Sequence, residues 1–139
     1  MKYLLDTNVV SELIHGSPIV AGNLVLYPRG QVVIPQPVAA EIEFGLALLP
    51  RGKRRDELSQ RWSRFNIELL RVLWTDSVSV QFAVIKAQLR KAGRIIEDFD
   101  IAIAAHAQAW NLTLVTSNNR HFAGIKDLQR VDWTKPQVP

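Results

Sequence analysis

Residues 2–8 read Lys-Tyr-Leu-Leu-Asp-Thr-Asn, a short apolar run followed at once by polar side chains. An apolar run this short and this close to the first residue is typical of a buried strand rather than a helix. Apolar residues then recur at helical spacing from Val9 to Ile14, so a helix is expected to begin near Thr7. Asp6 would lie at the carboxyl end of the strand, on the edge of an open α/β sheet where ligands bind. The alternative is that Asp6 only caps the helix.

The composition narrows the class of protein. A chain of 139 residues is expected to form one domain. It contains no cysteine, which excludes disulfides, zinc fingers and thiol catalysis. No apolar stretch reaches the ~20 residues of a membrane span, and the first residues do not resemble a signal peptide, so a cytoplasmic protein without a membrane partner is expected. The net charge of +4 favours a polyanionic partner, although it would suit solubility equally well.

Strands and helices alternate along the chain. Strands are expected at 3–5, 32–34, 69–74, 112–115 and 128–131, and helices at about 7–14, 36–49, 56–66, 76–92, 98–110 and 120–122. The segment 19–27 fits either a short helix or an irregular turn. This alternation predicts an α/β fold with a central parallel sheet of about five strands and helices on both faces. Right-handed crossovers then bring the carboxyl ends of all strands to one edge. Residues 1–133 are expected to form the domain and 134–139 a free tail.

The helix expected at 76–92 has recognisable ends. Asp76 or Ser77 is expected to cap its start, and Gly93 to end it. Helical spacing predicts that Val80, Val84 and Ala87 face the core.

Four further polar side chains are expected near Asp6. Glu41 lies in the first two turns of the helix after the second strand, and Asp100 in the first turn of its own helix. Asp98 begins that helix, and Asn118 follows the fourth strand. Crowded carboxylates repel one another unless a cation neutralises them, and oxygen ligands without cysteine suit Mg²⁺ or Mn²⁺. Two such ions can activate water and stabilise the leaving oxygen when a phosphodiester is cleaved.

Each of these residues also has a simpler interpretation. Glu41 could be a solvated helix acid, Asp98 an N-cap and Asp100 an acid that opposes the helix dipole. Asn118 could be an ordinary turn residue. Spacing alone leaves both interpretations open.

Four short motifs follow one another in order: Leu-Leu-Asp-Thr-Asn at 4–8, Glu-Ile-Glu-Phe-Gly at 41–45, Asp-Ile-Ala-Ile-Ala-Ala at 100–105 and Leu-Val-Thr-Ser-Asn at 114–118. Together they resemble the PIN-domain ribonucleases, and most of all the VapC-type toxins of prokaryotic toxin–antitoxin pairs. The resemblance spans nearly the whole chain. It implies a PIN-like three-layer α/β/α fold, Mg²⁺-dependent endoribonuclease activity on RNA, neutralisation by a VapB-like antitoxin, and a homodimer.

The resemblance carries catalysis and metal binding over to Asp6, Glu41 and Asp100. The family often has a fourth acid shortly after the Asn of the last motif, where this chain has His121. This departure puts a second metal site in doubt. Asp98 is one alternative source of the missing charge. The other alternative is that one metal is held by the protein and the other mainly by the substrate phosphates.

Five residues are expected to bind substrate. Thr116, Asn118 and His121 belong to the segment after the fourth strand, and a neutral His121 could instead bind a metal or be a plain turn residue. Arg54 and Arg55 belong to a basic stretch that could contact phosphates. A solvated basic helix is the simpler interpretation of that stretch.

Two other functions compete with the ribonuclease. A receiver-like signalling domain also places an acid at a strand end, but it needs a pair of acids there and a lysine at a later strand end. Only Asp6 is present, and Lys126 is poorly placed. A non-catalytic PIN-like binding module is the other alternative. The three core carboxylates argue against it, while the altered fourth position keeps it open.

Overall fold

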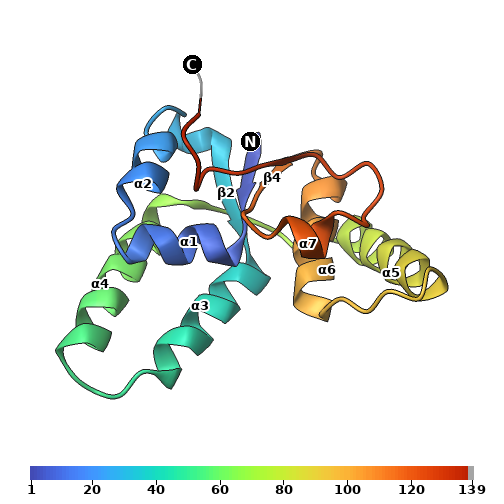
Figure 1. Cartoon of the computed structure of the whole chain (residues 1–139). Coiled ribbons are helices and arrows are strands. Elements are labelled where there is room, and N and C mark those ends of the chain that lie inside the picture. Colours follow the sequence, from blue (N-terminus) through green and yellow to red (C-terminus); the bar gives the residue numbers. More distant parts are fainter. Residues whose placement is uncertain (138–139) are drawn as a thin grey trace.

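A five-stranded sheet runs through the molecule in the order β3-β2-β1-β4-β5, with every neighbouring pair parallel (Figure 1). The computed structural model describes residues 1–137. The strands are β1 (Tyr3–Leu5), β2 (Val32–Pro35), β3 (Leu70–Val72), β4 (Thr113–Val115) and β5 (Arg130–Val131). β1 is central, with Leu4 opposite Val33 on one side and Leu114 on the other. The predicted parallel α/β sheet of about five strands is confirmed.

Within residues 1–137, seven α-helices connect and cover these strands. They are α1 (Thr7–Ile14), α2 (Pro18–Leu24), α3 (Gln36–Leu48), α4 (Lys53–Glu68), α5 (Asp76–Lys91), α6 (Asp98–Ala109) and α7 (Asn119–Phe122), with one 3₁₀ turn, η1 (Arg29–Gln31). In Figure 1, α1 to α4 lie on one side of the sheet and α5 to α7 on the other. The strand residues Leu4, Val33 and Leu114 are fully buried between these two groups. The three-layer arrangement follows from burying both faces of a parallel sheet.

Local capping explains where several helices begin. The ambiguous segment is the helix α2, because the Ser17 hydroxyl accepts a hydrogen bond from Val20 N and Pro18 occupies its first position. The helix α4 begins at Lys53, three residues earlier than expected, so Arg54 and Arg55 are helical. Thr75, rather than Asp76 or Ser77, caps α5 by accepting from Val78 N.

The buried face of α5 differs from the expected one. Val80 and Val84 are 63% and 43% exposed, whereas Val78, Ile85 and Leu89 are buried. Both sets have helical spacing, and α5 packs against α6. The expectation for Val80, Val84 and Ala87, which is exposed as well, was wrong because periodicity shows which residues share a face, but not which face a neighbour covers.

The last described residues pack against the central strand β1. Trp133 is fully buried and stacks on Tyr27 with ring centroids 4.9 Å apart, and Tyr3 lies 5.2 Å from the same indole. The Asn23 amide donates to the carbonyls of Trp133 and Lys135. The expected tail at 134–139 extends beyond the described residues, and its separation from the domain stays a prediction. Among helices of residues 1–137, none is long and apolar enough to cross a membrane.

Candidate active site

Asp6 lies where β1 ends and α1 begins. It is 3% exposed, and both carboxylate oxygens accept hydrogen bonds. Thr7 N donates to Oδ1 at 2.8 Å, and the Thr116 hydroxyl donates to Oδ2 at 2.7 Å. Thr116 follows β4, the strand beside β1, so parallel pairing brings its hydroxyl to the same sheet edge. Asp6 therefore caps α1, as the simpler interpretation holds, and also lies at the carboxyl edge where a ligand can bind.

Glu41 reaches the same place from α3. It lies in the second turn of that helix, and its Oε1 accepts a 2.6 Å hydrogen bond from the Thr7 hydroxyl. Thr7 thus contacts Asp6 through its backbone and Glu41 through its side chain. Glu43, two residues on, accepts instead from the Trp62 indole at 2.7 Å. The two glutamates of the motif are therefore separated: Glu41 lies beside Asp6, and Glu43 faces α4.

Asp100 enters from the first turn of α6. Its side chain is 13% exposed, and its Oδ2 lies 2.7 Å from Nδ1 of His121 on α7. The Asn118 amide nitrogen lies 2.8 Å from that same ring nitrogen. Asn118 N also donates to the Thr116 hydroxyl oxygen at 2.9 Å. A continuous chain of contacts therefore runs from Asp6 through Thr116, Asn118 and His121 to Asp100.

The three acids influence one another's ionisation. The pKa of Asp6 is raised from 3.8 to about 6, first by burial and then by the charges of Asp100 and Glu41, while hydrogen bonds from Thr116 and Thr7 act in the opposite direction. The pKa of Glu41 is also raised, first by burial and then by the charges of Asp100 and Glu97. Acids from the end of β1, from α3 and from α6 thus lie close together at one edge of the sheet.

Two solvent-open hollows meet at Glu41. One lies between α3 and the start of α6 and is lined by Ala40, Glu41, Phe44, Glu97, Asp98 and Phe99. The other runs along α1 and α3, where Thr7 and Glu41 lie among apolar residues such as Ile42 and Leu46. Glu41 is thus accessible, whereas Asp6 is buried.

The residues present suit a hard divalent cation. Three carboxylates face one another with no lysine or arginine among their hydrogen-bond partners, and oxygen donors of this kind are what Mg²⁺ and Mn²⁺ bind. Within residues 1–137, no three His, Asp or Glu side chains are arranged to hold an ion as they stand. Glu41 is bonded to Thr7 through Oε1 and Asp100 contacts His121 through Oδ2, so each carboxylate keeps a second oxygen with which to hold an ion.

Some predicted residues lie outside this cluster. Asp98 forms a 2.9 Å ion pair with Lys86 of α5, and its side chain is 61% exposed. Arg54 and Arg55 lie in the first turn of α4, which follows the carboxyl end of α3, whereas Glu41 lies in the second turn of α3. The Arg55 guanidinium donates to the carbonyl of Leu49. The cluster thus contains Asp6, Glu41 and Asp100, joined by Thr116, Asn118 and His121.

Thr7 was not predicted as a site residue. It joins Asp6 to Glu41, which is 34 positions away in the sequence. Its place directly after the acid in the first motif was the available signal, and that position was interpreted only as part of a helix cap.

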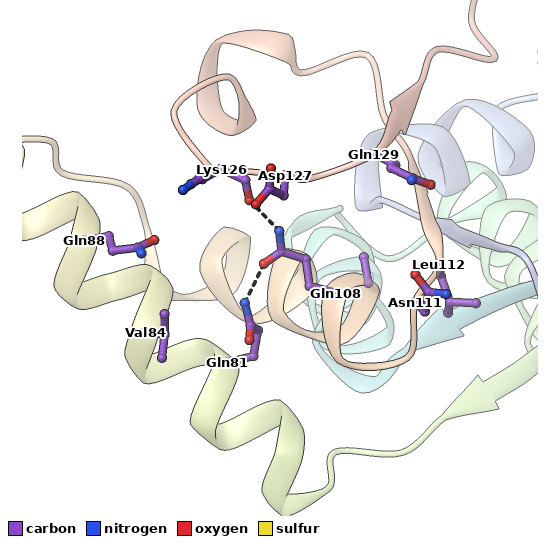
Figure 2. Close-up of a pocket in the computed structure, with 10 residues that line it drawn as sticks. Gln81, Val84, Gln88, Gln108, Asn111, Leu112, Lys126, Asp127 and Gln129 are labelled. Carbon is purple, nitrogen blue, oxygen red and sulfur yellow. Dashed lines mark hydrogen bonds between the residues drawn. The ribbon is translucent and has the colours of Figure 1, made fainter.

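The hollow drawn in Figure 2 lies between α5 and α6 and is lined largely by uncharged polar side chains. The Gln81 amide of α5 donates to Gln108 Oε1 of α6, and Gln108 Nε2 donates to the carbonyl of Lys126, both at 2.7 Å. Asp127 is the one acid that lines it. Leu112, which also lines it, precedes β4. This hollow therefore lies toward the amino end of the strand, away from the acid cluster.

Comparison with known proteins agrees with this geometry. The model of the PIN domain family matches residues 3–128. Ribonuclease VapC1 of Haemophilus influenzae is 33% identical over 97% of this chain and 100% of its own length. The tRNA(fMet)-specific endonuclease VapC of Shigella flexneri is 26% identical over 96% of this chain and 99% of its own. The crystal structure of VapBC2 from Rickettsia felis bound to a DNA fragment from their promoter superposes with a TM-score of 0.84 at 27% identity, covering 96% of this chain and 99% of that one.

Proposed function

This chain belongs to the PIN-domain family, as a VapC-type ribonuclease toxin of a toxin–antitoxin system, and we propose on that basis that it hydrolyses RNA with a divalent metal held by Asp6, Glu41 and Asp100. The observation that carries the proposal is the convergence of these three carboxylates, from β1, α3 and α6, at one edge of the sheet. Burial raises the pKa of Asp6 and Glu41, and the charges of the neighbouring acids raise it further. A site that leaves such repulsion in place is one that a cation would stabilise.

The residues of this chain have distinct parts in that reaction. When bound, Mg²⁺ or Mn²⁺ would supply an activated water and stabilise the leaving oxygen. Thr116 and Thr7 hold both oxygens of Asp6, and Thr7 also orients Glu41. Because Thr116 is fully buried, we propose that it positions Asp6 rather than touching substrate. Asn118 is partly exposed and remains the better candidate for contacting RNA.

The basic residues are proposed to guide RNA to the site. Arg54 and Arg55 lie away from the acid cluster, so they would act on the phosphates of a long substrate rather than on the bond that is cleaved. Transfer RNA is the first substrate to test, since the Shigella flexneri relative is specific for tRNA(fMet).

Chelation tests the metal part of this proposal. We expect EDTA to stop cleavage of a transfer RNA by the purified chain, and Mg²⁺ or Mn²⁺ in excess of the chelator to restore it. The measurement is the initial rate of cleavage on a gel with end-labelled RNA. Cleavage that continues unchanged in EDTA would contradict the metal mechanism, and no cleavage under any condition would favour the non-catalytic PIN-like module.

The two glutamates of the second motif provide a matched pair. Glu41→Gln is expected to lower the cleavage rate at least about a hundredfold, because the charge that it removes faces the reacting centre. Glu43→Gln should leave the rate within a factor of about two, since Glu43 only accepts the Trp62 indole hydrogen bond and that bond survives the change. Both rates are measured at saturating Mg²⁺. An equal loss of cleavage rate in the two variants would show that Glu41 has no specific role in the active site.

We also propose a VapB-like antitoxin as the partner of this chain in the cytoplasm. An arginine from that partner would suit a crowded group of carboxylates, to which it can donate two parallel hydrogen bonds. A homodimer is proposed as well, since Phe44 and Leu48 on one side of α3 are 65% and 69% exposed, and Phe99 at the start of α6 is 46% exposed. Exposed apolar groups that lie together mark protein interfaces.

A further inference from the structure

One nitrogen of His121 faces a carboxylate of the acid cluster. Nδ1 lies 2.7 Å from Asp100 Oδ2 and 2.8 Å from the Asn118 amide nitrogen. A ring nitrogen and a carboxylate oxygen that face each other at this distance share a positive charge, which either a proton or a metal ion can supply.

The burial of the pair shows where that charge would sit. The Asp100 side chain is 13% exposed and belongs to the acid cluster, while His121 is half-exposed and covers it from α7. Asn118, which contacts His121, is also bonded to Thr116, and Thr116 is bonded to Asp6. These contacts hold His121 in place next to the acid cluster. Nδ1 is thus directed at a carboxylate of the proposed metal site.

We propose that Nδ1 of His121 binds the same divalent ion as Asp100, and that this nitrogen ligand makes the site prefer Mn²⁺ to Mg²⁺. The inference rests on the proposed metal-dependent function. Mg²⁺ is a hard ion that takes oxygen ligands and keeps its waters. First-row transition ions bind imidazole nitrogen, and Mn²⁺ is the member of that series that also binds carboxylates and water well. The bound ion takes the place of the proton between Nδ1 and Oδ2.

Pulsed electron paramagnetic resonance of bound Mn²⁺ tests the ligand directly. The full chain is stripped of divalent ions and loaded with Mn²⁺ alone. We expect echo modulation from a directly bound imidazole ¹⁴N in the parent and its loss in His121→Asp and His121→Gln. His15→Gln is the matched control, because His15 lies at the end of α1, bonded to the Ser11 carbonyl, and lines the same hollow as Glu41. That variant should keep the modulation.

Calorimetric titration measures the selectivity. The ratio of the Mg²⁺ to the Mn²⁺ dissociation constant should fall by at least about tenfold in His121→Asp, which is the low end of what losing even an outer partner of a metal ligand costs. Circular dichroism melts in EDTA establish that each variant is folded. His121 is half-exposed on a surface turn, so both substitutions are expected to be tolerated.

The possible failures have different meanings. If the parent binds neither ion, the metal part of the proposed function is wrong and this inference falls with it. If the parent binds Mn²⁺ without ¹⁴N modulation, and the selectivity is the same in His121→Asp, then His121 is not a ligand and the metal-dependent function stands. Retained modulation in both His121 variants would also overturn the assignment.

Discussion

An Asp6→Asn variant is expected to unfold at a higher temperature than the parent in metal-free buffer near pH 7, while losing RNA cleavage. Burial and two neighbouring acids raise the pKa of Asp6 from 3.8 to about 6. At 1.36 kcal/mol per pKa unit, this shift of about two units corresponds to about 3 kcal/mol of lost stability. Asparagine keeps the shape and still accepts from Thr7 N. For a domain of this size the melting temperature should rise by about 10 °C.

The free energy of unfolding of the parent depends on pH, and the shift of the Asp6 pKa sets the direction of that dependence. Because the pKa is higher in the folded state, the folded chain binds more protons than the unfolded chain between about pH 4 and 6. The free energy of unfolding of the parent therefore falls as the pH rises through this window. Above this window Asp6 is ionised and its full destabilising effect on the folded state is present. Below the window Asp6 is protonated and the effect is absent. The difference in stability between Asp6→Asn and the parent should accordingly vanish near pH 4.

The same variant reports on catalysis. Loss of the Asp6 charge should lower the cleavage rate at least about a hundredfold and remove most of the stabilisation by Mg²⁺. Asp98→Asn is the control, since Asp98 pairs with Lys86 at the surface; an exposed pair is worth at most about 1 kcal/mol, and cleavage should be unchanged. A lower melting temperature for Asp6→Asn together with full activity would show that Asp6 is only a helix cap.

Replacing Trp133 with alanine is expected to destabilise the fold by about 3–5 kcal/mol. The indole is fully buried and stacked on Tyr27, with Tyr3 of β1 against it. Its removal leaves a large cavity beside the central strand. The free energy of unfolding is measured by urea titration in EDTA, so that metal binding does not contribute.

Two control variants are expected to lose less stability than Trp133→Ala. Trp133→Phe keeps a ring on Tyr27 and removes an indole N–H that has no hydrogen-bond partner within residues 1–137, so its loss should be much smaller than that of alanine. Trp74→Ala removes an indole that is 48% exposed and should cost less than Trp133→Ala. A loss below about 1 kcal/mol for Trp133→Ala would mean that the last residues are not part of the packed domain.

The sequence alone predicted the layout of the sheet and the place of the acids. Short apolar runs such as 3–5 and 32–34 become buried strands because both faces of a parallel strand are covered. Once strands alternate with helices, right-handed crossovers leave little freedom in where the carboxyl ends meet. Local pattern therefore predicted that Asp6, Glu41 and Asp100 lie near one edge without excluding simpler roles for each, and the resemblance to PIN-domain ribonucleases named the fold, the function and the three acids as site residues.

Only the tertiary structure decided which groups touch. Periodicity did not show that Val78 rather than Val80 is the buried side of α5, because either stripe could face a neighbour. Nothing local shows that Thr7 bonds Glu41 across 34 positions, or that His121 meets Asp100 across 21. Such contacts depend on how helices from separate crossovers lie over the sheet edge. The local sequence sets what each segment can form, and the packing of distant segments decides which side chains share a hydrogen bond.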